Sequence, residues 1–123
     1  MKESRVESRE SGVGSRESGE FMIDVGAKKD TKRIAKAQSY IKLNAEIVGL
    51  IRAGKIPKGN VLEAARFAGI LAAKNTAGLL PLCHNLPLNF GGVEFQVQKD
   101  GVLINTEARC TGKTGVEMEA LVA

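Results

Sequence analysis

The residues of this 123-residue chain that could do chemistry gather in two short segments, the first of which runs from Pro81 to Pro87. It contains Cys83 and His84, and His84 is the only histidine in the sequence. One histidine and two cysteines cannot supply a histidine-based cluster within one subunit, so we expect no metal site. The two prolines favour a rigid loop, which can present a polar group to a ligand. A purely structural histidine is an equally good interpretation.

The second segment, Cys110 to Gly115, is similar to the end of a phosphate-binding P-loop. That motif needs a glycine five residues before Gly112, where this chain has Glu107. The mismatch argues against a nucleotide hydrolase of that class. Lys113 still adds positive charge between two glycines, and free amides at a helix start attract anions. The segment is therefore either an anion-binding turn or an ordinary glycine turn into a helix.

Two carboxylates follow in a predicted helix. Thr114 and Glu117 have the spacing of a capping box, which predicts that the helix begins there. Glu119 lies roughly 200° around the helix axis from Glu117, so both cannot face one site. Because Glu119 stands in an apolar run, burying its carboxylate without a partner would be costly. We expect Glu119 either to face solvent or to contact a cation or a hydrogen-bond donor of a ligand.

The strands that must position these residues are predicted from alternating hydrophobicity. A short apolar run over residues 21–25 predicts one strand, and alternation over residues 33–43 predicts a second. Residues 93–108 alternate on both sides of the turn signal Asp100-Gly101, which predicts a hairpin.

Two helices are predicted between these strands. Apolar residues at helical spacing predict a helix over residues 44–52, and a basic loop follows over residues 53–59. Asn60 and Glu63 have capping-box spacing and begin a helix that runs to about Lys74. The polar residues of this second helix fall on one narrow stripe, which predicts that most of its remaining surface is buried against a sheet or a partner.

Composition divides the chain at residue 20. Residues 1–20 are a near-repeat of Glu, Ser and Arg, and we expect a disordered low-complexity tail because they can bury little apolar surface. Residues 21–123 form the predicted domain and carry a net charge of +5, against −1 for the tail. This charge suits an anionic small molecule or a nucleic acid, or is merely a basic surface. With no Trp and one Tyr, the domain has few rings on which bases could stack.

The sequence also indicates in which compartment of the cell the protein is expected. Its apolar runs are shorter than the roughly 20 residues that a membrane-spanning helix needs, and its N-terminal region lacks the pattern of a signal peptide. Two cysteines do not suggest a disulfide framework. We therefore expect a cytoplasmic protein.

Several motifs together resemble one protein family. They cover residues 58–61, 64–70, 72–74, 80–84 and 111–121, and the last of them reads Thr-Gly-Lys-Thr-Gly-Val-Glu-Met-Glu-Ala-Leu. In order and without large gaps, they resemble cyclic pyranopterin monophosphate synthase, the molybdenum cofactor biosynthesis protein C family. The resemblance implies an α+β, ferredoxin-like fold with helices packed on one face of an antiparallel sheet. It also implies a homohexamer, assembled as a trimer of dimers.

The activity implied by the resemblance is that of a lyase. Family members convert (8S)-3′,8-cyclo-7,8-dihydroguanosine 5′-triphosphate into cyclic pyranopterin monophosphate and diphosphate, a step towards molybdopterin. No cofactor is implied beyond Mg²⁺ that accompanies the substrate triphosphate. A triphosphate substrate would suit the basic domain. We expect a small-molecule partner, and neither nucleic acid nor membrane.

The resemblance also assigns residues to the site. Lys58 matches a catalytic lysine that would move protons, and Arg33 matches an arginine that helps to hold the phosphates across a subunit interface. Arg33 and His84 would hold the triphosphate so that diphosphate can leave. The substrate-binding positions are Arg33, Leu82, Cys83, His84, Met118 and Glu119, with Glu117, Lys113 and Arg109 as weaker assignments.

One departure from the family pattern accompanies the match. The main catalytic aspartate and lysine of the family follow the last helix, beyond the position of Ala123, and neither occurs at a matching position in these 123 residues. We therefore expect this chain by itself to have little turnover while it retains some substrate binding. Two alternatives stay open: a non-catalytic module for an anionic metabolite or nucleotide, and a structural or nucleic-acid-binding protein whose affinity falls steeply with salt.

Overall fold

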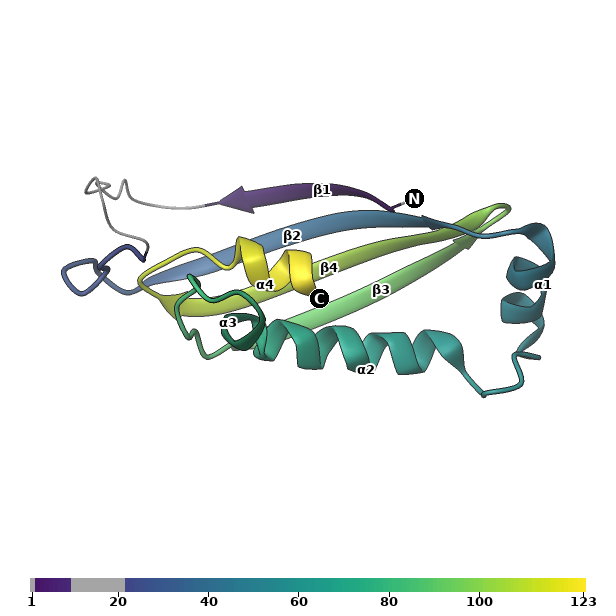
Figure 1. Ribbon diagram of the computed structural model, residues 1–123. Helices are drawn as coiled ribbons and strands as arrows, with labels where there is room; N and C mark the ends of the chain where they lie inside the picture. The colour runs from purple at the N-terminus through teal and green to yellow at the C-terminus, as the bar shows by residue number, and fades with distance from the viewer. Residues whose placement is uncertain (1, 10–21) are drawn as a thin grey trace.

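The computed structural model describes residues 22–123 and, as backbone, residues 2–9. These described residues form four strands and four helices (Figure 1). The strands are β1 (Lys2–Arg9), β2 (Thr31–Lys42), β3 (Phe90–Gln98) and β4 (Gly101–Gly112). The helices are α1 (Ala45–Ala53), α2 (Val61–Lys74), α3 (Thr76–Leu79) and α4 (Glu117–Val122).

The strands form one antiparallel sheet in the order β1-β2-β4-β3. Helices α2, α3 and α4 lie over one face of the sheet, and α1 stands at one end of it (Figure 1). The predicted α+β class with helices on one face is therefore confirmed, as are the strand over residues 33–43 and the hairpin of β3 and β4.

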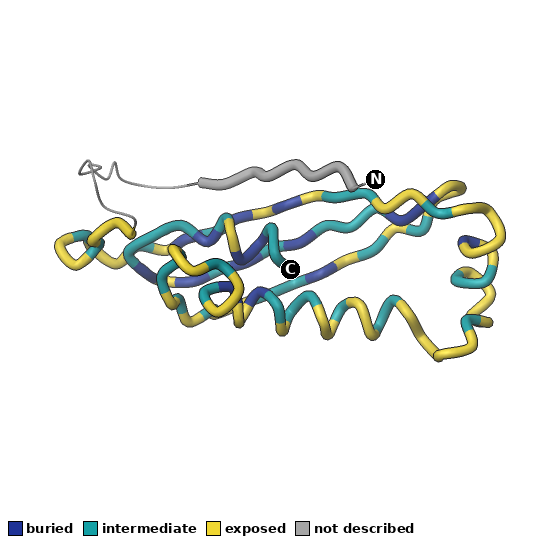
Figure 2. Tube along the Cα trace, in the orientation of Figure 1, coloured by how far each residue is buried: buried dark blue, intermediate teal, exposed yellow. Residues whose placement is uncertain are grey.

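The core lies between the two central strands and α4. Alternate residues of β2 and β4 face the helices, and most of them have small side chains, which lets α4 lie close to the sheet. Buried residues accordingly follow the central strands and α4 in Figure 2, while α1 and α2 are largely exposed. The buried cluster consists of Ala35, Ala37, Ala108, Cys110, Val116 and Ala120.

Both early helices begin where the sequence predicted. Asn44 caps α1, because its side-chain oxygen accepts a hydrogen bond from the Ile47 amide at 2.9 Å. Asn60 caps α2 in the same way, accepting from the Glu63 amide at 3.1 Å. The Glu63 carboxylate does not complete a reciprocal capping box and instead pairs with Arg66.

Two local predictions were wrong. Residues 22–25 form a loop and not a strand, and residue 21 lies outside the described part of the chain. This segment could not pair with β2, the strand that follows it in the chain, because β2 already pairs with β1 on one side and β4 on the other. The capping box at Thr114 also fails: α4 begins at Glu117, no side chain caps it, and Val116 occupies the N-cap position. Val116 is fully buried, so core packing sets the start of this helix.

The predicted N-terminal tail lies partly in the sheet. Residues 2–9 form β1, which pairs with β2 from Lys2 opposite Ile41 to Arg9 opposite Ile34. Backbone pairing to an open strand edge does not require apolar side chains, which is why composition gave no sign of it. The rest of the predicted tail, residue 1 and residues 10–20, lies outside the described residues.

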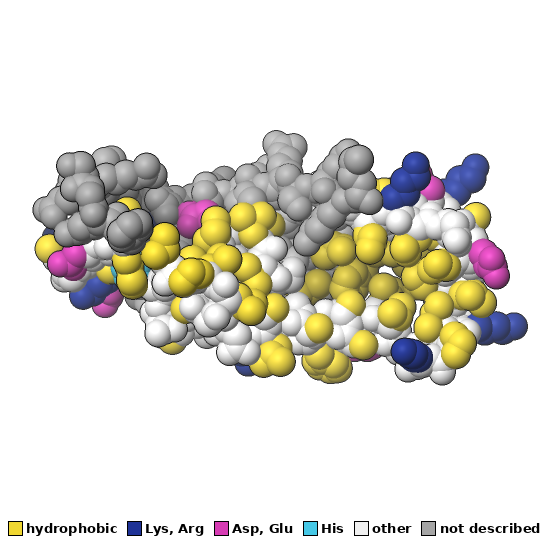
Figure 3. Space-filling model, viewed as in Figure 1, with side chains coloured by type: hydrophobic (Ala, Val, Ile, Leu, Met, Phe, Trp, Pro, Cys, Tyr) yellow, Lys and Arg dark blue, Asp and Glu magenta, His cyan; other side chains and the backbone are white. Residues whose placement is uncertain are grey.

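Helix α2 is less buried than its narrow polar stripe predicted. Phe67 is 68% exposed and Leu71 is 60% exposed, because the helix contacts β3 and α4 along one side only. Figure 3 shows hydrophobic side chains gathered where α1 and α2 border the sheet, with a hollow among them. The prediction of burial was therefore wrong for this chain by itself.

Candidate functional site

The candidate site lies at the end of the sheet where β2 begins and β4 ends. Three segments meet there: the loop that precedes β2, the loop between α3 and β3, and the turn from β4 into α4. A hydrogen bond of 2.7 Å joins His84 Nε2 to the carbonyl oxygen of Ile23. Lys113 Nζ donates to the carbonyl oxygen of Gly26 at 3.3 Å. These contacts bring two of the predicted site residues, far apart in the sequence, against the same loop.

Arg33 is the most unusual side chain of this region. Its position on β2 turns it to the helix-covered face, where it is only 2% exposed. Its Nη2 donates to the carbonyl oxygen of Lys113 at 3.5 Å, but its Nε and Nη1 have no hydrogen-bond partner among the described residues. Buried donors normally have partners, and an unpaired buried charge is especially costly. The guanidinium is therefore built to receive an acceptor that the described residues do not supply.

Thr31 extends the same set of unpaired groups. It lies two residues before Arg33, so both side chains are on one face of β2. The buried hydroxyl oxygen of Thr31 also lacks a partner among the residues that the structure describes. Thr31 was not among the residues predicted from the sequence, although its spacing from Arg33 on an alternating strand could have indicated it.

Glu119, on α4, is a buried carboxyl group whose charge acts on Cys110, as the charge of Arg33 also does. It is 4% exposed, so the solvent-facing alternative from the sequence is wrong. Burial raises the pKa of Glu119, and the charge of Glu117 raises it further, while a backbone hydrogen bond opposes the shift. The raised pKa favours the protonated acid, which can donate a hydrogen bond as well as accept one.

The charge of Glu119 acts on both cysteines. Burial raises the pKa of Cys83 and of Cys110, and in both cases the charge of Glu119 adds to the effect. Arg33, which is opposite Cys110 in the sheet, acts in the other direction on the Cys110 pKa. Both thiols are free and are held in the protonated form, so they suit packing and weak polar contact better than nucleophilic attack.

One ring nitrogen of His84, Nε2, is already used in a hydrogen bond. The Ile23 carbonyl can only accept, so Nε2 carries the hydrogen of this bond, and Nδ1 is left for another partner. Leu82, two residues earlier, is 54% exposed, and Met118 on α4 is 42% exposed. These two side chains can offer apolar contact at the edge of the site.

Two predicted residues lie elsewhere in the chain. Lys58 is exposed in the loop between α1 and α2, at the opposite end of the molecule from the loop between α3 and β3 (Figure 1). Arg109 follows the alternation of β4 onto the helix-free face, where it bonds Glu107 at 2.8 Å and lies over the Phe90 ring. One copy of the chain therefore assembles Arg33, Cys83, His84, Lys113 and Glu119, but not Lys58 or Arg109.

Ala123 follows α4 and is the last residue of the sequence. Its amide donates to the carbonyl oxygen of Glu119 at 3.1 Å, which closes the last turn of the helix. Its backbone packs against α2, because a Cβ placed on Gly69 would come within 3.2 Å of the Ala123 carbonyl carbon. The aspartate and lysine that the family resemblance places beyond Ala123 are outside these 123 residues. The low turnover expected of this chain by itself therefore stays a prediction.

A cavity of about 410 Å³ lies away from this cluster, on the helix-free face of the sheet. It opens over Gly92, and the side chains of Lys36, Gln38, Glu94 and Glu107 are among its lining. None of the predicted site residues lines it. Among the described residues, unpaired buried atoms occur at Thr31 and Arg33 in the candidate site and also at Arg109 Nε on the helix-free face, so the cavity and the cluster are separate features.

Metal ligands and membrane spans can be assessed for the described residues. No group of three or more His, Cys, Asp or Glu side chains there could hold a metal ion. Within the same part of the chain, no helix is both long enough and apolar enough to span a membrane.

Comparisons with known proteins agree on one family. The MoaC family model matches residues 22–123. The chain is 49% identical over 102 residues to the cyclic pyranopterin monophosphate synthase of Novosphingobium aromaticivorans, covering 83% of this chain and 65% of that protein. It is 49% identical to the enzyme of the same name from Herpetosiphon aurantiacus, covering 83% of this chain and 63% of the relative. For the probable synthase of Pyrococcus furiosus the identity is 51%, with coverages of 85% and 67%. The chain thus spans about two thirds of the length of these relatives.

Proposed function

This chain belongs to the MoaC family, and on that premise we propose that it binds (8S)-3′,8-cyclo-7,8-dihydroguanosine 5′-triphosphate, with Mg²⁺ on the phosphates. We propose further that the protein acts as a cyclic pyranopterin monophosphate synthase, a lyase that releases diphosphate. The names of its relatives support this activity. The chemistry of the candidate site supports the class of substrate.

The observation that carries the proposal is the buried Arg33 guanidinium, whose Nε and Nη1 have no partner among the described residues. A phosphate oxygen accepts from a guanidinium through short, charge-assisted hydrogen bonds, which would satisfy both nitrogens. Lys113 on the adjoining turn adds a second positive charge. A phosphate group is therefore the ligand that this end of the sheet fits best.

The neighbouring residues then have distinct roles in the proposal. His84 Nδ1 and the hydroxyl of Thr31 contact the phosphates or the sugar, since each has hydrogen-bonding capacity to spare. Burial favours the protonated form of Glu119, and in that form its carboxyl group donates a hydrogen bond to the ligand without repelling the triphosphate. Positioning and charge stabilisation would supply much of the rate, as in phosphoryl transfers generally.

In this proposal, a second copy of the chain contributes Lys58 to the site. Within one copy, the loop between α1 and α2 that carries Lys58 lies at the opposite end of the molecule from the start of β2, where Arg33 is located (Figure 1). A site that uses both residues must therefore lie between two copies. The exposed apolar residues of α2 support such association, which we propose produces a homohexamer. Sedimentation velocity tests this, and a strictly monomeric chain would contradict the shared site.

The substrate proposal is tested by binding, because the chain spans about two thirds of the length of its relatives. Isothermal titration of the cyclic triphosphate, and separately of inorganic triphosphate, should give saturable binding to the wild-type chain. Arg33→Gln should weaken both affinities by about 10- to 100-fold, the value of one or two charge-assisted hydrogen bonds. Product formation and diphosphate release, measured in parallel, test the proposed activity.

The matched control is Lys36→Gln, which removes one positive charge from the same strand. Lys36 lies on the helix-free face, where its ammonium is 4.0 Å from the Glu107 carboxylate. Its substitution should leave both affinities within about twofold of wild type. Equal losses in the two variants would mean that triphosphate responds to overall charge, and the proposed site would be rejected.

A further inference from the structure

Strand β3 forms one edge of the sheet, because the order β1-β2-β4-β3 gives it a neighbour on one side only. It is nine residues long and carries Val93, Phe95 and Val97 at alternate positions. An edge of this length normally exposes a row of backbone groups that another strand can pair with. What occupies that row therefore decides whether the sheet can be extended.

Two arginines from the helices reach this edge. Arg66 of α2 donates from Nε to the carbonyl oxygen of Val93 at 3.0 Å. Arg52 of α1 donates from Nη2 to the carbonyl oxygen of Val97 at 2.9 Å. The two acceptors are four residues apart on one strand, so both point to the same edge, and the backbone groups of Phe95 between them point there as well.

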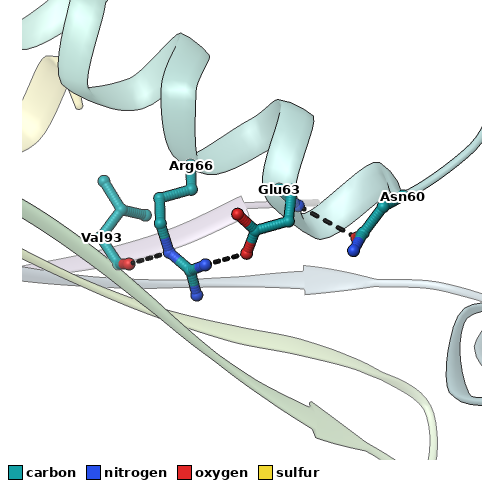
Figure 4. A network of polar contacts seen from close by, with 4 residues as sticks. All are labelled: Asn60, Glu63, Arg66 and Val93. Atoms are coloured by element: carbon teal, nitrogen blue, oxygen red, sulfur yellow. Dashed lines mark hydrogen bonds and ion pairs between the residues drawn. The ribbon is translucent and has the colours of Figure 1, made fainter.

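Neighbouring side chains hold the Arg66 guanidinium in place, as Figure 4 shows. Its Nη1 pairs with the carboxylate of Glu63, and the Glu63 amide is in turn bonded to the capping side chain of Asn60. The guanidinium also lies 5.7 Å from the centre of the Phe95 ring. The start of α2 thus fixes the arginine against the strand.

The carbonyl groups of Val93 and Val97, which the arginines occupy, lie two residues on either side of Phe95. If β3 paired with the β3 of a second copy about a two-fold axis at Phe95, Val93 of one copy would stand opposite Val97 of the other. The Val93 carbonyl would accept from the partner's Val97 amide, and the Val97 carbonyl from the partner's Val93 amide. These are the two acceptors that Arg66 and Arg52 occupy.

We propose that Arg52 and Arg66 close the β3 edge against pairing with β3 of a second copy. Each arginine takes the hydrogen bond that a partner strand would make, and each places a charge where the partner backbone would have to lie. The edge therefore stays unpaired in the wild-type chain, and association is left to other surfaces. This inference is independent of the proposed substrate.

The test replaces both arginines by methionine, which keeps an unbranched apolar stem and removes the donors. Sedimentation velocity of the double variant, R52M/R66M, should show association beyond the particle formed by the wild type. Hydrogen exchange should at the same time slow at the Phe95 amide. Adding Val97→Pro should reverse the association, because proline has no N–H to donate to the partner's Val93 carbonyl.

The matched control is K55M/K74M, which removes two positive charges from the loop after α1 and from the end of α2. It should sediment as the wild type does. If R52M/R66M does not fold, the single variant R52M replaces it, because R52M keeps the Asn60–Glu63–Arg66 contacts. We expect R52M to associate more weakly than the double variant would, and therefore only at higher protein concentration. Wild-type sedimentation and unchanged Phe95 exchange in the folded arginine variants would overturn the proposal.

Discussion

At the scale of single residues, Glu119 is itself shifted in pKa and affects the ionisation of both cysteines. Its own pKa is raised by burial, and its charge raises the pKa of both Cys83 and Cys110. Desolvation is the largest cause of the shift in the Glu119 pKa, so burial favours the protonated form of this carboxyl group.

The raised pKa of Glu119 predicts a particular dependence of stability on pH. The folded state binds this proton more tightly than the unfolded state, so stability is highest below the unfolded value near 4.5 and falls as the pH rises through the folded pKa. Glu119→Gln stays neutral and should show a shallower fall. Urea unfolding at several pH values between about 4 and 8 measures this slope.

Glu94→Gln is the control for that experiment, because Glu94 is an exposed carboxylate on β3. It should keep the wild-type slope. Parallel stability curves for Glu119→Gln and the wild type would contradict the assignment of a raised pKa. Alkylation of Cys83 by iodoacetamide gives a second readout, and should be faster in Glu119→Gln because a charge that opposes the thiolate is gone.

At the scale of elements, the start of α2 depends on one side chain. The Asn60 oxygen satisfies the Glu63 amide, and the same turn carries the Arg66 that reaches β3. Asn60→Ala should lower the free energy of unfolding by about 1 kcal/mol, the usual value of an N-cap. Asn60→Asp should retain most of it. Denaturant unfolding compares them, and equal stabilities for wild type and Asn60→Ala would mean that water replaces the cap.

The hairpin of β3 and β4 makes a second prediction at this scale. A Cβ at Gly101 would overlap the Ile41 carbonyl oxygen and the Tyr40 ring, so Gly101→Ala should destabilise by about 1–3 kcal/mol, as overpacking does. Gly49→Ala, inside α1 with no atom within 4 Å of its Cβ, should stabilise by about 0.5–1 kcal/mol. Thermal unfolding of both variants tests whether close packing sets the sign.

Tyr40 joins β2 to the turn between β3 and β4 through a hydrogen bond. Its hydroxyl donates to the Asp100 carboxylate, and this hydrogen bond, followed by partial desolvation and the charge of Asp100, raises the pKa of Tyr40 to about 12. Asp100→Asn should bring the pKa of Tyr40 back towards 10, because the charge is lost. A spectroscopic titration of the single tyrosine follows this directly, and an unchanged pKa would contradict the contact.

At the scale of the whole molecule, the chain leaves much apolar surface uncovered. Phe67, Leu71 and Leu79 are each at least 60% exposed, and a hollow lies among the hydrophobic side chains between α1, α2 and the sheet (Figure 3). Apolar surface of this kind commonly marks a contact with another protein surface. It agrees with the proposal that copies of the chain associate.

Phe67→Ser tests that interpretation. In an isolated chain the exposed ring contributes little, so the free energy of unfolding should change by less than about 0.5 kcal/mol at high dilution. At concentrations where copies associate, the variant should form smaller particles than the wild type. Val48→Ala, at a residue only 3% exposed, is the contrast and should lower stability at every concentration. Particle sizes that do not change in Phe67→Ser would exclude this face from the contact.

Local pattern was enough to predict much of the fold. Alternation gave β2 and the hairpin of β3 and β4, apolar spacing gave α1, and Asn60 marked the start of α2. These features depend on neighbours within a few residues, so the sequence contains the interactions that create them. The family signature was equally local, and the match over residues 22–123 confirmed it.

The tertiary structure alone decided which of the predicted residues meet. It buried Arg33 and Glu119, and it placed Arg109 on the opposite face of the sheet. The loop that carries Lys58 lies at the other end of the molecule from the start of β2 (Figure 1). Pairing of β1 and the start of α4 were decided in the same way, by an open strand edge and by the buried Val116. Each outcome depends on contacts between segments that are distant in the chain, and local spacing does not encode such contacts.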